Sequence, residues 1–132
     1  MSVEIDVDPA RVDRDVVWGY LSTQAYWGRR RTRADVDTQI DGAWRVVGAY
    51  RDGEMVGFAR AVSDGVAFGY LADVFVLPDA QGAGVGKALV AAMLDGTDRF
   101  RWTLFTADAH PLYAGFGFGE PDATAMVRRP AG

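Results

Sequence analysis

The chain is predicted to fold as an α+β domain with a mixed central sheet flanked by helices. Two runs of strand-forming residues at 44–51 and 54–62 are joined by Asp52-Gly53, a dipeptide typical of a tight β-hairpin. Between residues 66 and 106 a strand, a glycine-rich turn, a helix and another strand follow one another, which is the order of a βαβ crossover. Antiparallel strands followed by such a crossover imply a mixed sheet.

The first forty residues predict one short strand and two helices. Apolar and polar residues alternate over 3–7, as in a half-buried strand. Apolar residues at helical spacing from 12 to 20 predict the first helix, and Asp13 and Asp15 favour its start because acidic groups stabilise helix N-termini. The polar stretch 29–40 predicts a second helix.

The second half of the chain is predicted to alternate between strands and helices. In the helix after the glycine-rich turn, the residues on one face are apolar and are expected to pack on the sheet: Val85, Leu89, Ala92 and Met93. The other predicted elements are strands over 66–77 and 102–106, a short helix over 109–116 and two last strands near 117–120 and 123–129. The predicted order is β-α-α-β-β-β-α-β-α-β-β.

Composition restricts the classes of function. A length of 132 residues predicts a single domain spanning 1–132. The chain has no cysteine and one histidine, which excludes disulfides and makes a transition-metal site an unfavoured interpretation. No apolar run is long enough to span a membrane, and the N-terminus does not resemble a secretion signal, so a cytoplasmic protein is expected. A net charge of −4 argues against nucleic-acid binding.

The most informative segment is 76–87, Val-Leu-Pro-Asp-Ala-Gln-Gly-Ala-Gly-Val-Gly-Lys. A strand, a glycine-rich loop and a helix start form a site for an anion, since glycine allows close approach and the helix N-terminus presents free N–H groups. The spacing does not fit a nucleoside triphosphate loop, because only three residues separate Gly82 from Gly86 and Ala88 replaces the required hydroxyl. A dinucleotide fingerprint is also incomplete, since its third glycine is missing.

The pattern Gln81-x-x-Gly84-x-Gly86 resembles the pyrophosphate-binding loop of the GNAT superfamily of acyl-CoA-dependent N-acetyltransferases. The segment 108–118, Asp-Ala-His-Pro-Leu-Tyr-Ala-Gly-Phe-Gly-Phe, is similar to a later motif of that superfamily. Tyr26-Trp27 with Arg31, and the strand segment 70–76, resemble a small single-domain subgroup. The resemblance extends from about residue 10 to 127.

This resemblance implies that acetyl-CoA is the co-substrate and that no metal is used. The backbone amides of the glycine loop would hold the pyrophosphate, and strand amides would hold the pantetheine arm and the developing oxyanion. Lys87 either pairs with a phosphate or is a solvated residue of the first helical turn. The implied cofactor-binding residues are Val74, Phe75, Val76, Gln81, Gly82, Ala83, Gly84, Val85, Gly86 and Lys87.

Two residues are candidates for catalysis. Tyr113 matches the motif tyrosine that assists the leaving thiolate; the alternative is a core residue beside Phe116 and Phe118. Asp73 is the candidate base or substrate anchor, because burying a carboxylate in an otherwise apolar strand is costly and implies a role for it. An ordinary aspartate with a pKa of about 3.9 is a weak base, so burial would have to raise that pKa, or the carboxylate would act through a water molecule. The alternative is an ion pair with an arginine or a loop cap.

His110 is assigned a structural role, because Asp108 and Pro111 around it are typical of an N-cap and a first helical turn. Tyr26, Trp27 and Arg31 are candidate substrate-binding residues together with Asp73. The aromatic rings would enclose the acceptor and Arg31 would bind a carboxylate. The alternative is a solvated basic helix face.

The sequence therefore predicts an N-acetyltransferase that acts on a primary amine of a small molecule by direct attack in a ternary complex. The alternatives are a protein or peptide amine acetyltransferase and a non-catalytic acyl-CoA-binding module. A homodimer is a further expectation, because Trp18, Trp44 and Trp102 serve either the core or a dimer contact.

Overall fold

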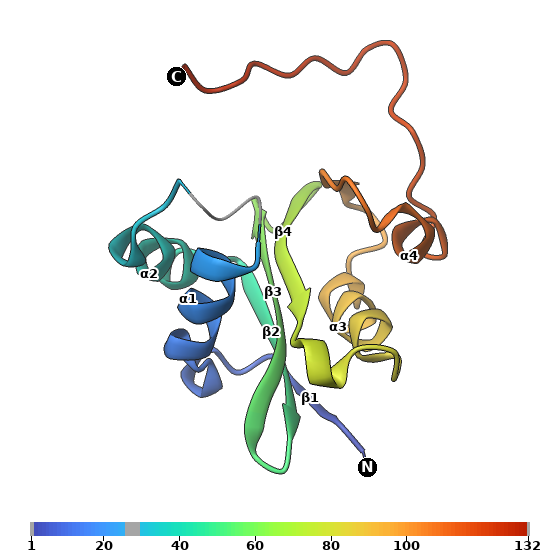
Figure 1. Cartoon of the computed structure of the whole chain (residues 1–132). Coiled ribbons are helices and arrows are strands. Elements are labelled where there is room, and N and C mark those ends of the chain that lie inside the picture. Colours follow the sequence, from blue (N-terminus) through green and yellow to red (C-terminus); the bar gives the residue numbers. More distant parts are fainter. Residues whose placement is uncertain (1, 26–29, 132) are drawn as a thin grey trace.

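Five strands form one mixed sheet in the order β1-β2-β3-β4-β5 (Figure 1). The computed structural model describes residues 2–25 and 30–131. The first four strands pair antiparallel, and β5 pairs parallel to β4, so the predicted mixed sheet is confirmed. The strands are β1 (Glu4–Asp6), β2 (Arg45–Arg51), β3 (Glu54–Ser63), β4 (Phe68–Val76) and β5 (Arg101–Thr103).

Helices cover both faces of the sheet. The helices α1 (Arg14–Thr23) and α2 (Arg33–Asp41) lie on one face, and α3 (Val85–Leu94) and α4 (His110–Ala114) lie on the other (Figure 1). Two short 3-10 helices, η1 (Pro9–Arg11) and η3 (Pro78–Ala80), connect elements. None of the helices in the described ranges is long and apolar enough to cross a membrane.

Each helical layer has its own hydrophobic core. Val17, Leu21 and Phe58 are central to the core under α1 and α2. Leu89 and Met93 of α3 lie in the other core, together with Val85, so the predicted face of this helix is confirmed. The partly buried side chains packed against these cores include Trp18, Trp44 and Trp102.

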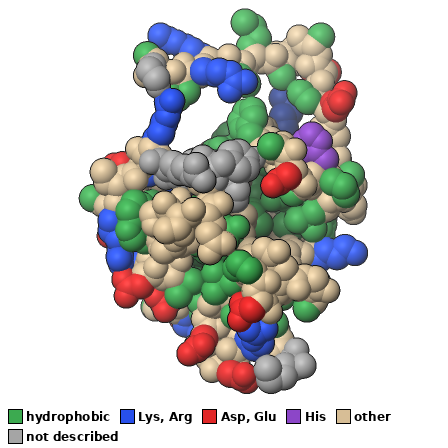
Figure 2. Space-filling view, in the orientation of Figure 1, with side chains coloured by type: hydrophobic (Ala, Val, Ile, Leu, Met, Phe, Trp, Pro, Cys, Tyr) green, Lys and Arg blue, Asp and Glu red, His purple; other side chains and the backbone are tan. Residues whose placement is uncertain are grey.

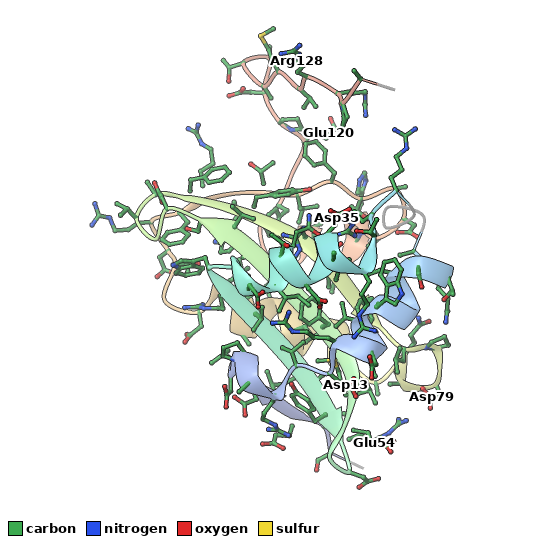
Figure 3. The ribbon with its side chains drawn as sticks, turned by 90° about the vertical axis from the view of Figure 1, so that its left-hand side faces the viewer. Asp13, Asp35, Glu54, Asp79, Glu120 and Arg128 are labelled. Carbon is green, nitrogen blue, oxygen red and sulfur yellow. The ribbon has the colours of Figure 1, made fainter. Side chains whose placement is uncertain are left out.

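Side-chain caps fix the starts of the first two helices. The Asp13 carboxylate accepts hydrogen bonds from the amides of Asp15 and Val16 at 3.1 and 3.2 Å, which confirms the predicted start of α1. At α2, Thr32 and Asp35 form a reciprocal capping box, so the helix begins at Arg33 and not at 29 (Figure 3 labels Asp13 and Asp35). Residues 26–29 lie outside the described residues.

The predicted hairpin between β2 and β3 is confirmed. Asp52 and Gly53 have φ angles of 53° and 82°, as a two-residue turn with both residues in the left-handed region requires.

A β-bulge divides β4 into two parts. Ala72 pairs with Arg60 and Phe75 pairs with Phe58, so Asp73 and Val74 together oppose a single residue of β3. Asp73 has a φ of 53°, in the left-handed region. The extra residue reverses the alternation of side chains along the strand.

The two strands predicted near 117–120 and 123–129 are wrong. The structure has no strand in the described residues after α4, and residues 119–131 form an exposed extension of the chain. A strand requires a neighbouring strand to accept and donate its backbone hydrogen bonds, and this extension runs clear of the sheet (Figure 1).

Candidate active site

The glycine loop ends in an uncapped helix N-terminus. Gly84 is the N-cap of α3 with a φ of 78°, and Gly82 has a φ of 84°. The first backbone bond of the helix runs from the Ala88 amide to the Gly84 carbonyl, so the amides of Val85, Gly86 and Lys87 have no intrahelical acceptor. A Cβ atom added at Gly82 or Gly84 would meet no atom within 4 Å, so there is open space beside the loop. The residues present therefore fit a diphosphate.

The Gln81 side chain connects this loop to the strand. Its Nε2 donates to the Val76 carbonyl oxygen at 3.0 Å. Gln81 was predicted to bind the cofactor. In this structure its side-chain amide holds the loop against the end of β4. Lys87 is exposed in the first turn of α3.

The edge of β4 opens beyond its first three residues. β5 pairs with β4 only along Phe68, Gly69 and Tyr70. The Leu77 amide donates to Val56 of β3, so by alternation the Phe75 amide faces β3, while the amides of Val74 and Val76 face the other way. The N–H groups of Val74 and Val76 therefore point to the part of the β4 edge that does not pair with β5, where they could donate to a ligand. The Phe75 amide points to β3 and could not.

The helix α4 packs beside the start of α3. A Cβ added at Gly86 would lie 3.7 Å from a Leu112 methyl and 3.9 Å from a Val76 methyl. The end of β4, the first turn of α3 and α4 thus meet at one place. Tyr113 is buried in the core on this side, and its ring makes an edge-to-face contact with Phe118, with centroids 5.8 Å apart.

The start of α4 differs from the prediction. Its N-cap is Ala109, so the prediction of Asp108 as N-cap is wrong, although Pro111 does lie in the first turn. The Thr106 hydroxyl accepts a hydrogen bond from the Ala109 amide at 3.2 Å, in the turn that precedes the helix. The His110 Nε2 atom lies 3.0 Å from the Thr106 carbonyl oxygen, which agrees with a structural role for the histidine.

On the opposite face, Asp73 forms an ion-pair cluster with two arginines. Arg31 donates from its two terminal nitrogens to the two carboxylate oxygens, each at 2.8 Å. The Arg60 Nε donates to the same carboxylate at 2.6 Å. Arg31 also donates to the Gln39 side chain at 2.6 Å. The carboxylate and Arg60 are buried, so this is a desolvated cluster and not a surface ion pair.

The cluster decides the ionisation of Asp73. Burial alone would raise the pKa of its carboxyl group, but the hydrogen bonds from Arg31 and the charge of Arg60 outweigh burial and lower that pKa. The same hydrogen bonds raise the pKa of Arg31. Of the two routes by which Asp73 could act as a base, the one that needs a raised pKa is therefore not met. The geometry matches the alternative stated for it, an ion pair with an arginine.

Two residues on the α1 and α2 side of the sheet were not predicted from the sequence. Arg60 lies in a buried apolar strand, which is the same signal that identified Asp73. The Tyr20 ring stacks on Phe75 with centroids 4.2 Å apart, and only the packing of α1 on β4 reveals it. Burial raises the pKa of Tyr20, and the negative charge of Asp108 raises it further.

The remaining predicted site residues are Tyr26 and Trp27, which lie outside the described residues. Within the described ranges, no group of three or more histidine and acidic side chains is arranged to hold a metal ion.

Comparison with known proteins identifies the family of the chain. Residues 42–120 match the family model described as an acetyltransferase (GNAT) domain. A Gibberella zeae protein named "Putative acetyltransferase FG08082" is 33% identical over 125 residues, covering 84% of this chain and 70% of that protein. A crystal structure of a protein from Xanthomonas campestris pv. campestris, assigned to the GNAT family, has a TM-score of 0.92 and 36% identity, covering 98% and 94% of the two chains.

One solved structure with the same fold contains ligands. N-acetylglutamate synthase from Neisseria gonorrhoeae, complexed with coenzyme A and N-acetyl-glutamate, has a TM-score of 0.74 at 20% identity. The superposition covers 96% of this chain and 30% of the Neisseria chain.

A mixed sheet with a glycine loop at a helix N-terminus and an opened strand edge is the arrangement that the resemblance to the acyl-CoA-dependent acetyltransferases implies. The chain belongs to the GNAT family of acetyltransferases. It is an enzyme of the N-acetyltransferase class, and this family uses acetyl-CoA as the acetyl donor.

Proposed function

We propose that the chain transfers an acetyl group from acetyl-CoA to the primary amine of a small molecule, by direct attack within a ternary complex. One observation carries the proposal: the outward-facing amides of the glycine loop, the opened edge of β4 and the helix that carries Tyr113 meet around Val76, Gly86 and Leu112. A diphosphate, a thioester and a leaving sulfur need donors of these three kinds in one place.

The backbone supplies most of the donor site. The amides from Gly82 to Lys87 would bind the pyrophosphate, helped by the positive end of the α3 dipole. The amides of Val74 and Val76 would donate to the pantetheine arm and to the thioester oxygen. Fixed N–H groups stabilise the negative charge that develops on this oxygen without any reorganisation at the moment of reaction.

The reaction itself needs two proton transfers. The amine nitrogen attacks the thioester carbon, the C–S bond breaks, and the sulfur leaves as a thiolate that takes up a proton. Tyr113 would stabilise the thiolate mainly by hydrogen bonding. Full proton transfer from a phenol with a pKa of about 10 to a thiolate whose thiol has a pKa of about 8.5 costs about 2 kcal/mol. The amine would lose its proton to water, since the lowered pKa of Asp73 makes that carboxylate a weaker base than usual.

The acceptor would be a small amine that also carries a carboxylate. Two arginines and one aspartate give the cluster of Arg31, Asp73 and Arg60 one net positive charge, which favours an anionic acceptor. Tyr26, Trp27 and Arg31 would line this side of the site. The N-acetylglutamate bound by the Neisseria enzyme is a compound of this class in a protein of the same fold.

The test is release of free thiol from acetyl-CoA with a panel of amino acids, polyamines, aminoglycosides and peptides. Since the chain has no cysteine, a thiol reagent reports only coenzyme A. We expect turnover with one or more free amino acids or similar anions. Calorimetry that detects no coenzyme A binding would exclude the proposal. Coenzyme A binding without turnover would indicate a binding module, and turnover with peptides alone would indicate a protein acetyltransferase.

The order of events is tested separately. Direct attack predicts intersecting initial-rate lines and no mass increase of the chain after incubation with acetyl-CoA alone. A stable acetylated chain that then transfers its acetyl group to an amine would contradict the ternary complex.

A further inference from the structure

The Arg60 guanidinium is buried, and only its Nε–H group is hydrogen-bonded. The side chain is 8% exposed, and its Nε donates to the Asp73 carboxylate at 2.6 Å. Within residues 2–25 and 30–131, the two terminal nitrogens, Nη1 and Nη2, donate to no acceptor. A buried donor without a partner is costly in free energy, so these N–H groups indicate a place for a ligand.

The terminal nitrogens of Arg60 are within reach of solvent. Among the described residues, the one fully enclosed side-chain polar atom without a hydrogen-bond partner is the Tyr50 hydroxyl. Nη1 and Nη2 lack partners but are not enclosed in this way, so part of the guanidinium touches open space. The basic side chains in view in Figure 2 lie toward the outline of the molecule, whereas the charge of Arg60 lies inside it. The anionic group of a small molecule can therefore reach Arg60.

The other arginine of the cluster is already engaged. Arg31 directs both terminal nitrogens at the two oxygens of Asp73, each at 2.8 Å, and its Nη1 also donates to Gln39 at 2.6 Å. This end-on pairing is the bidentate geometry that the carboxylate of a ligand would otherwise take. In Arg60 the same end-on pair of N–H groups is unused. The residue expected from the sequence to bind a carboxylate is thus occupied, and Arg60 offers the same geometry.

Asp73 holds Arg60 in a fixed orientation. It lies in the bulge of β4 with a φ of 53°, a conformation that is uncommon for residues other than glycine. Such backbone conformations persist where the surrounding structure enforces them, and they cluster at ligand sites. A donor that is already fixed loses little conformational entropy on binding, so a guanidinium held in this way is suited to bind an anion.

Arg60 lies close to the place where acetyl transfer would occur. Asp73, its hydrogen-bond partner, directly precedes Val74, whose amide points to the opened edge of β4. Arg60 itself is on β3, one strand inside that edge, and neighbouring strands are about 4.8 Å apart. An acceptor of a few carbon atoms can therefore bind Arg60 at one end and present its amine at the edge with the other.

We propose that Arg60 determines acceptor specificity by binding the carboxylate of a small amino acid through Nη1 and Nη2. The inference rests on the proposed function and deepens it, because it assigns recognition of the carboxylate to Arg60 and not to Arg31. A bound carboxylate would also balance the charge of the cluster, which has two cations and one anion. Asp73 is then a positioning residue, since it orients Arg60 without touching the acceptor.

Matched pairs of acceptors test the assignment. The thiol-release assay compares an amino acid with its primary amide, for example leucine with leucinamide and β-alanine with β-alaninamide. The ratio of kcat/KM for the acid to that for the amide is measured in the wild type and in Arg60→Lys, which keeps the charge but loses the paired donors. We expect this ratio to fall at least about tenfold, mainly through KM of the acid. An unchanged ratio would overturn the proposal.

Two further lysine variants serve as controls. Arg31→Lys tests the rival carboxylate site, and Arg14→Lys makes the same substitution in an ion pair at the surface. We expect both to retain the preference for the acid, and its loss in Arg31→Lys alone would contradict the assignment to Arg60. Coenzyme A binding by calorimetry and turnover of the amides should persist in Arg60→Lys. A wild type that neither binds coenzyme A nor releases thiol would refute the proposed function itself, whereas an unchanged ratio refutes this inference alone.

A crystal structure of the wild type tests the contact even if Arg60→Lys does not fold. The crystals contain coenzyme A and the N-acetyl product of the amino acid with the highest kcat/KM. We expect both carboxylate oxygens to lie within about 3 Å of Nη1 and Nη2 of Arg60. A carboxylate bound by Arg31 alone, or by neither arginine, would exclude the proposed role.

Discussion

The two faces of β4 are built by different means. On the α3 side, donors for the cofactor are backbone amides, positioned by glycine conformation and by a helix start over a few adjacent residues. On the α1 and α2 side, Arg31, Asp73 and Arg60 converge from a loop and two strands, and Asp73 is 42 positions along the chain from Arg31 and 13 from Arg60.

The difference shows how each face can be disturbed. A backbone site depends on local conformation, so a single substitution in the loop should weaken binding and cost less stability than the loss of a member of the buried cluster. A buried ion-pair cluster depends on all of its members, so the loss of one leaves the others charged and unpaired. Stability experiments should therefore be most sensitive to the cluster, and binding experiments to the loop.

The largest effect on stability is expected for Asp73→Asn. Removing the carboxylate charge leaves Arg60 buried without its anion, at a cost of about 3–5 kcal/mol in the free energy of unfolding. Denaturant unfolding measures this. Asp15→Asn is the matched control, since its ion pair with Arg33 is exposed and should contribute less than about 1 kcal/mol. Equal losses in the two variants would show that burial of the cluster adds nothing.

The next effect is expected for Tyr113→Phe in turnover. If the hydroxyl stabilises the leaving thiolate, kcat should fall about 100-fold, which is about 2.7 kcal/mol, with little change in coenzyme A affinity. Tyr50→Phe removes the same atom on the other face. Within the described residues the Tyr50 hydroxyl is buried and finds no hydrogen-bond partner, so kcat should not change. An unchanged kcat in the Tyr113 variant would leave this tyrosine a core residue only.

A smaller effect is expected for Gly84→Ala in cofactor binding. Both Gly84 and Gly96 have positive φ angles, 78° and 73°, and open space around the position of a Cβ. Alanine at either site costs about 1–2 kcal/mol of backbone strain. Only the change at Gly84 also places a methyl group beside the proposed diphosphate, so calorimetry should find roughly tenfold weaker coenzyme A binding there. Equal affinity in both variants would move the diphosphate away from this loop.

The smallest effect concerns acid pH. The pKa of Asp73 is lowered in the folded state, so its contribution to stability is complete above the unfolded value of about 3.9 and is lost as the pH falls through the folded value. Unfolding free energies measured from neutral pH downward should therefore fall more steeply below about pH 4 in the wild type than in Asp73→Asn. Parallel curves would show that the arginines do not lower this pKa.

The sequence predicts local features of this molecule well. The Asp13 cap, the Asp52-Gly53 turn and the loop at Gly84 were all identified because the residues that determine them are adjacent. An ion pair of Asp73 with one arginine was only one of several alternatives, and the second arginine was not predicted, since a sequence does not state which distant strands and loops converge. The bulge at Asp73 and the partner of Tyr20 were not predicted for the same reason.

The last two strands were predicted wrongly for another reason. Residues 123–129 have strand-forming composition, but composition cannot say whether a strand edge lies within reach of the segment. The strand propensity of these residues is not realised, because no strand edge is available for them to pair with.

The bulge divides β4 into two segments. Odd-numbered residues face the α3 core before the bulge, and even-numbered residues face it after the bulge. Before it, Leu71 points to the α3 core; after it, Val74 and Val76 point there, while Phe75 points to the α1 core. Deleting residue 73 would restore regular pairing, with Val74 opposite Ala59 and Phe75 still opposite Phe58, so the side chains of both cores would keep their faces and only the carboxylate would be lost. The bulge therefore adds a carboxylate beside Arg31 and Arg60 without moving any core side chain of the strand to the wrong face.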